Sequence, residues 1–96
     1  MTQTKQNISD LRSEIDIVDE KLIKLLAERQ RLVEAVIAVK KRDGVAARIP
    51  ARGDYVIDRA RVLARAHHLD PALAETIWTE MVEWFVAHEE RAMETK

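Results

Sequence analysis

Apolar residues recur at intervals of three and four along the first part of the chain. The positions concerned are Ile8, Leu11, Ile15, Val18, Leu22, Leu25, Leu32, Val36 and Val39. This period matches the 3.6-residue turn of an α-helix and predicts one amphipathic helix over about residues 9–42. The segment is rich in Leu, Ala, Glu, Lys and Arg, which favour helix, and "DGVAARIP" (43–50) ends it.

Two further helical blocks follow, separated by glycine and proline. The second covers about residues 52–67 and is expected to place Val56, Ala60 and Leu63 on one buried face. The third opens at Asp70, which can cap, with Pro71 at the first helical position, and runs to near Met93. Its inward positions are expected to be Ile77, Trp78, Met81, Val82 and Phe85. No strand pattern interrupts the three blocks, so the sequence predicts an all-α fold in one domain, residues 1–96.

The first helix is too long for the other two helices to cover. More than thirty residues at about 1.5 Å each form a rod of roughly 50 Å. A compact chain of this size has a diameter of roughly 32 Å. Its apolar stripe therefore needs a partner, and a symmetric homodimer is the simplest one, with an ordinary coiled coil as the alternative.

Composition narrows the classes of function. The formal net charge is −1 and the basic residues are interspersed with acids, which argues against nucleic acid as a partner. There is no cysteine, and the adjacent His67 and His68 suit a helix C-terminus better than a metal site. A polar start and the lack of a long apolar run predict a cytoplasmic protein without a membrane segment.

One cation occupies the apolar stripe of the first helix. Arg29 stands between Leu25 and Leu32, and Lys40, eleven positions later, points within about 20° of the same direction. Arg12 points about 100° away and cannot easily join them, although in an intertwined dimer it could reach the cavity of the partner chain. Arg52 begins the inner face of the second helix, and Glu89 extends the inward stripe of the third. A lone arginine would more simply pair with an acid and extend to solvent. Together, however, these residues predict a pocket for a small dicarboxylate.

The segments "LRSEIDIVDEKLIKLLAERQRLVEAVIAVK" (11–40) and "ARAHHLD" (64–70) closely resemble the all-helical, type II chorismate mutase family. The resemblance implies an intertwined three-helix homodimer whose active sites draw residues from both chains. It also implies the pericyclic rearrangement of chorismate to prephenate, which needs no cofactor or metal. Positioning of the substrate and preorganised positive charge are what such an enzyme can contribute.

Residue roles follow from the same resemblance. Arg12 is donated across the dimer to one substrate carboxylate, Arg29 holds the other, and Arg52 is a further cation. Lys40 contacts the ether oxygen and a carboxylate, and Glu89 stands where the family usually has glutamine, beside the ether oxygen. Glu89 can donate a hydrogen bond only when protonated, so activity should fall as the pH rises and Glu89 ionises.

Phe85, one turn before Glu89, is included among the substrate-contacting residues, with core packing as the alternative. Trp84, its neighbour, is expected at the rim.

Two positions depart from the family pattern. Gly53 replaces a glutamate that holds the ring hydroxyl, and Ile49 replaces an aspartate. With "IPA" (49–51) and "WFVA" (84–87), they resemble the isochorismate-pyruvate lyase branch, which produces salicylate. The mutase is therefore the first hypothesis, the lyase the second, and a non-catalytic helical dimerisation or regulatory module the third.

Overall fold

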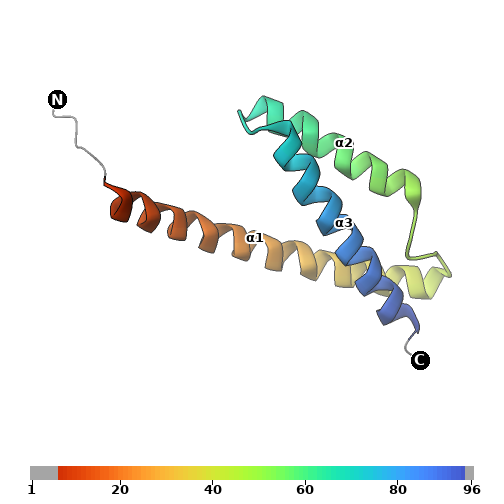
Figure 1. Cartoon of the computed structure of the whole chain (residues 1–96). Helices are drawn as coiled ribbons and strands as arrows, with labels where there is room; N and C mark the ends of the chain where they lie inside the picture. Colours follow the sequence, from red (N-terminus) through yellow and green to blue (C-terminus); the bar gives the residue numbers. More distant parts are fainter. Residues whose placement is uncertain (1–6, 95–96) are drawn as a thin grey trace. The chain divides into compact units, whose positions relative to one another are not determined.

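The computed structural model describes residues 7–94, which form three α-helices and no strand. They are α1 (Ile8–Asp43), α2 (Pro50–Ala66) and α3 (Pro71–Glu94) (Figure 1). The predicted all-α fold is confirmed, and each helix starts and ends within two residues of its expected bounds. Residues 1–6 and 95–96, which belong to the predicted domain, lie outside the described part. In residues 7–94, no helix is both long and apolar enough to cross a membrane.

The ends of α1 are closed by local hydrogen bonds. The Asn7 side chain accepts a hydrogen bond from the Asp10 backbone N–H at 2.9 Å, a cap that extends the helix one residue beyond the expected start. At the other end Gly44 has a φ of +70°, and the Val45 N–H donates to the Lys40 carbonyl at 2.9 Å. This is the Schellman pattern, in which a glycine in the left-handed conformation ends the helix.

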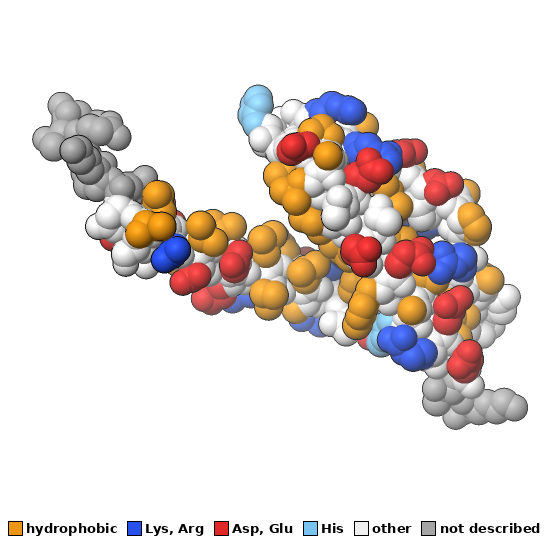
Figure 2. All heavy atoms as spheres, in the orientation of Figure 1, with side chains coloured by type: hydrophobic (Ala, Val, Ile, Leu, Met, Phe, Trp, Pro, Cys, Tyr) orange, Lys and Arg blue, Asp and Glu red, His pale blue; other side chains and the backbone are white. Residues whose placement is uncertain are grey.

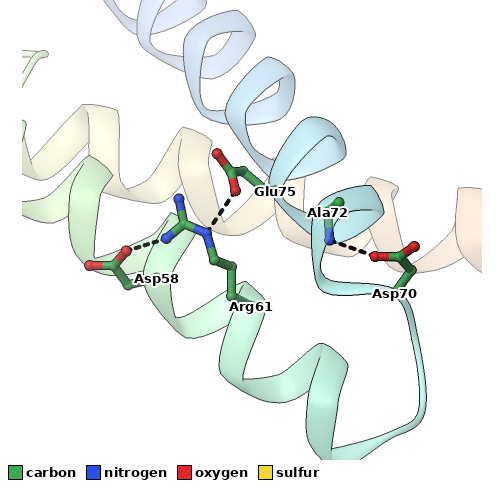
Figure 3. Close-up of polar contacts among 5 residues, drawn as sticks. All are labelled: Asp58, Arg61, Asp70, Ala72 and Glu75. Atoms are coloured by element: carbon green, nitrogen blue, oxygen red, sulfur yellow. Dashed lines mark hydrogen bonds and ion pairs between the residues drawn. The ribbon is translucent and has the colours of Figure 1, made fainter.

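The ends of the shorter helices also follow from the sequence. α2 begins at Pro50, two residues before the expected start, because proline suits the first helical position. It ends at Ala66, and His67 occupies its C-cap. Asp70 caps α3 as predicted, its carboxylate accepting from the Ala72 N–H at 2.9 Å (Figure 3).

The chain divides into two compact units, residues 1–34 and residues 35–96. The described part of the first unit is the N-terminal part of α1. Its large apolar side chains are exposed, as the orange spheres along this helix show in Figure 2. They include Ile8, Leu11, Ile15, Val18, Leu22, Leu25 and Leu32, all members of the predicted stripe. Glu20 and Lys24, one turn apart on this helix, form a surface ion pair at 3.3 Å.

The second unit contains the end of α1, α2 and α3, and its core lies where α2 and α3 run side by side (Figure 1). Ala60 and Ala64 from α2 and Ala74 from α3 are buried, and Trp78 packs against them. Alanines allow the two backbones to approach closely, which explains why small residues occupy the centre. The prediction that Leu63 and Ile77 are core residues is wrong for the single chain, in which they are 39% and 42% exposed.

An ion-pair cluster also links α2 to α3. The guanidinium of Arg61 donates from Nε to Oε1 of Glu75 at 2.9 Å and from Nη1 to the carboxylate of Asp58 (Figure 3). The hydrogen bond from Arg61 lowers the pKa of Glu75 from its ordinary value of 4.5. Because these side chains are between 31% and 72% exposed, the cluster orients the two helices more than it stabilises them.

Candidate active site

Lys40 and Glu89 form an ion pair in the interior of the second unit. The Nζ atom of Lys40 lies 2.8 Å from Oε1 of Glu89, and the two side chains are 14% and 10% exposed. Among residues 7–94, Glu89 is the one polar or charged residue that is buried, with 8% of its surface exposed. Burying two charges is costly unless they are paired and hydrogen-bonded, so such a pair marks a candidate functional site.

Three parts of the fold bring the pair together. Lys40 lies in the last turn of α1, where a cation also suits the negative end of the helix dipole. Glu89 lies on the inward stripe of α3, which follows Trp78, Val82 and Phe85 at spacings of four, three and four as predicted. The loop of residues 44–49 supplies the third contact, because Nζ of Lys40 also donates to the carbonyl of Ala47 at 2.9 Å.

The ammonium of Lys40 keeps one donor for another oxygen atom. An ammonium has three N–H groups, and among the described residues two acceptors, Glu89 Oε1 and Ala47 O, take one each. The group is mostly shielded from water, where a positive charge acts more strongly on a nearby oxygen than it does in bulk solvent. The pair is therefore suited to stabilising negative charge that develops on a bound oxygen.

The two arginines expected from α1 lie in the first unit. Arg29 is half-buried, whereas the flanking stripe residues Leu25 and Leu32 are exposed. Arg12 is exposed as well. Their approach to Lys40 in a common pocket, and that of Arg12 across a dimer, stay predictions.

Arg52 and Phe85 belong to the same unit as Lys40. Arg52 lies in the first turn of α2, is exposed, and has its guanidinium carbon 5.3 Å from the centre of the Tyr55 ring. Phe85 is 8% exposed and meets the ring of Trp84 edge-on at 5.1 Å, whereas Trp84 is 53% exposed. The expectation of Trp84 at the rim fits this exposure. Phe85 is a core residue on the same face as Glu89, and its contact with a substrate stays a prediction.

The two departures from the family pattern sit at the start of α2. Ile49 is the N-cap residue and offers no side-chain cap. Gly53 is half-buried, and a Cβ atom there would lie 3.6 Å from Cγ1 of Val82, an ordinary contact. A side chain at position 53 would therefore point toward α3, the helix that carries Phe85 and Glu89.

Two features of the site had no signal in the sequence pattern. One is the Ala47 carbonyl, since every residue has one and only the loop path directs it. The other is a two-pronged ion pair next to it, in which Arg48 donates to both carboxylate oxygens of Glu83 at 2.9 and 3.0 Å. Arg48 and Glu83 carry opposite charges, but so do many pairs in this chain.

The geometry defines a class of protein: an all-helical protein with a largely shielded cation held by a carboxylate and a backbone carbonyl. No group of three or more potential metal ligands is found in residues 7–94.

Comparison with known proteins specifies the family within that class. The family model described as chorismate mutase type II matches residues 11–90, and the chain therefore belongs to this family. A protein named chorismate mutase from Methanocaldococcus jannaschii is 32% identical over 78 residues, which cover 81% of this chain and 79% of that protein. The resemblance noted in the sequence is thus confirmed, and both matches carry the mutase name rather than that of the lyase.

Proposed function

We propose that this protein catalyses the rearrangement of chorismate to prephenate. The observation that carries the proposal is the largely shielded ammonium of Lys40, 2.8 Å from Glu89 and 2.9 Å from the Ala47 carbonyl, in a chain of the chorismate mutase type II family. The reaction breaks a carbon–oxygen bond and forms a carbon–carbon bond within one molecule. It therefore needs a compact substrate conformation and charge stabilisation rather than a nucleophile.

Lys40 has the main electrostatic role. Negative charge accumulates on the ether oxygen as its bond to carbon breaks, and the remaining N–H of the ammonium donates to that oxygen. The two protein acceptors hold Nζ in place beforehand, so little reorganisation is needed during the reaction. Glu89 accepts from the same ammonium and keeps it directed toward the site.

The arginines bind the two carboxylates of the substrate. Arg29 and Arg52 come from the same chain as Lys40, and their planar guanidinium groups suit two-pronged contacts with carboxylates. Arg12 comes from a second copy of the chain. Support for a homodimer comes from the part of α1 that lies in the first unit. It exposes a long row of large apolar side chains, which the α1 helix of a second chain can cover.

The decisive experiment is an activity assay with matched variants. The protein is incubated with chorismate, the loss of the substrate's ultraviolet absorbance is followed, and prephenate is identified by NMR. Lys40→Ala is expected to lower kcat/KM by roughly 100- to 1,000-fold, the usual effect of removing one preorganised donor. Lys41→Ala is the control, because this neighbouring lysine is exposed and donates to the Ala92 carbonyl instead.

Three results would contradict the proposal. Equal activity of the Lys40→Ala and Lys41→Ala variants would remove Lys40 from the reaction. Formation of fluorescent salicylate from isochorismate, with no prephenate from chorismate, would replace the mutase by the lyase. A properly folded dimer that converts neither substrate would favour a non-catalytic module.

A further inference from the structure

The loop between α1 and α2 is attached to both ends of Lys40. The Lys40 carbonyl accepts a hydrogen bond from the Val45 N–H at 2.9 Å, and the Lys40 ammonium donates to the Ala47 carbonyl at 2.9 Å. The position of Nζ therefore depends on where the loop of residues 44–49 holds the Ala47 carbonyl.

The next residue along the loop is fixed to α3. Arg48 Nη1 donates to Glu83 Oε2 at 2.9 Å, and Nη2 donates to Glu83 Oε1 at 3.0 Å. The Ala47 carbonyl and the Arg48 nitrogen belong to the same planar peptide group, which rotates as one body. Fixing the Arg48 side chain to α3 therefore restricts the direction in which the Ala47 carbonyl points.

We propose that Arg48 and Glu83 are positioning residues for the reaction: their ion pair holds the Ala47 carbonyl against the Lys40 ammonium. The inference rests on the proposed function, because it assigns Lys40 the central electrostatic role. Neither residue touches the ammonium itself. Their effect is transmitted through one peptide group.

The exposure of the Arg48–Glu83 ion pair separates a positioning role from a role in stability. The side chains of Arg48 and Glu83 are 47% and 56% exposed, and exposed ion pairs contribute little to the free energy of unfolding. Catalysis is more sensitive, since a displacement of about 1 Å in a catalytic group can lower the rate by as much as about 100-fold. Loss of the pair should therefore reduce the rate more than it reduces stability.

The charges around the pair set the pH range in which it exists. The hydrogen bond from Arg48 lowers the pKa of Glu83 from its ordinary value of 4.5, and Glu83 in turn raises the pKa of Arg48, with a smaller contribution from Glu90. The ion pair is therefore complete above pH 4.5 and is lost as the pH falls below that value and Glu83 takes up a proton. At neutral pH it is fully formed.

The test compares this ion pair with a second, partly exposed ion pair between Arg61 and Glu75, which lies outside the loop. Arg48→Gln and Glu83→Gln are expected to lower kcat by roughly three- to tenfold with KM changed less than about twofold, because the binding groups stay in place. The matched controls are Arg61→Gln and Glu75→Gln, which remove the pair between α2 and α3. They are expected to leave kcat within about 1.5-fold of the original protein, at a similar small cost in stability.

Charge reversal separates positioning from direct contact with the substrate. Arg48→Glu and Glu83→Arg should each lower kcat, and the double variant, which restores an ion pair in the opposite sense, should recover most of it. A second readout does not depend on activity. Hydrogen exchange at the Val45 amide, whose N–H donates to the Lys40 carbonyl, should become faster in Arg48→Gln and Glu83→Gln. It should stay unchanged in the two control variants.

The inference and the proposed function fail in different ways. If the unchanged protein does not rearrange chorismate, the proposed function is wrong, and the positioning role falls with it. If the protein is active but the loop variants match the Arg61 and Glu75 controls in kcat and in Val45 exchange, the inference alone is wrong. A charge-reversed double variant that recovers nothing would also overturn it, since Arg48 would then act on the substrate itself.

Discussion

Replacing Lys40 by methionine should destabilise the protein far more than an ordinary surface substitution. Methionine keeps the length of the side chain but removes the charge, which leaves the buried carboxylate of Glu89 without the cation 2.8 Å away. Removing one partner of a buried ion pair typically costs 3–5 kcal/mol, and we expect about 3 kcal/mol because both side chains keep some exposure.

The assay is urea unfolding at pH 7 and at one fixed protein concentration, because the stability of a dimer depends on concentration. With a slope of about 1.5 kcal/mol per molar urea, the midpoint should fall by about 2 M. Lys24→Met is the matched control: its pair with Glu20 is 3.3 Å long and more than 70% exposed at both side chains. We expect it to lower the free energy of unfolding by no more than about 0.5 kcal/mol.

The double variant Lys40→Met, Glu89→Met provides the refutation. Replacing both partners by apolar groups of similar size removes the uncompensated charge, so the double variant should be more stable than Lys40→Met alone. If Lys40→Met costs no more than Lys24→Met, or if adding Glu89→Met lowers stability further, the reasoning from a buried, mutually dependent pair is wrong.

Four other predictions concern the site residues and the two glycines. Glu89→Gln should alter the pH–rate profile; an unchanged profile would exclude Glu89 from proton-dependent catalysis. Mixing inactive Arg12→Ala and Lys40→Ala chains should restore about a quarter of the activity, because half of the dimers are then mixed and each contains one intact site. No recovery after chain exchange would place Arg12 outside the partner's site. Gly53→Ala should raise the free energy of unfolding by about 0.5–1 kcal/mol in thermal or urea unfolding, since the helix has room for the methyl group. Gly44→Ala should lower it by about 1 kcal/mol, because the residue has a φ of +70°.

The helices of this protein could be predicted because their signals are local. The spacing of apolar residues identified α1, and Gly44, Pro50 and the Asp70-Pro71 pair marked where helices end or begin. The cap at Asn7 and the earlier start of α2 shifted the bounds by no more than two residues. Each of these features depends on residues within one or two turns of each other.

The packing of α2 on α3 was predicted less well. The sequence pattern placed both Ala60 and Leu63 on the buried face, and only Ala60 is buried; Ala64, which was not predicted, is buried where Leu63 is exposed. The periodic pattern identifies an apolar side but does not say which residues of that side meet the neighbouring helix. Close approach of the two backbones selects the small residues, and larger ones at the edge stay exposed.

The sequence alone determined that Lys40 and Glu89 each point inward on a helix, and that their residue types suit an electrostatic site for an anionic substrate. Only the tertiary structure decided that these residues, 49 positions apart, lie 2.8 Å from each other, that the Ala47 carbonyl shares the same ammonium, and that Arg48 fixes this peptide to Glu83. The physical reason is that helical periodicity is a property of neighbouring residues. The direction of a loop carbonyl and the meeting of distant charges depend on how the whole chain packs.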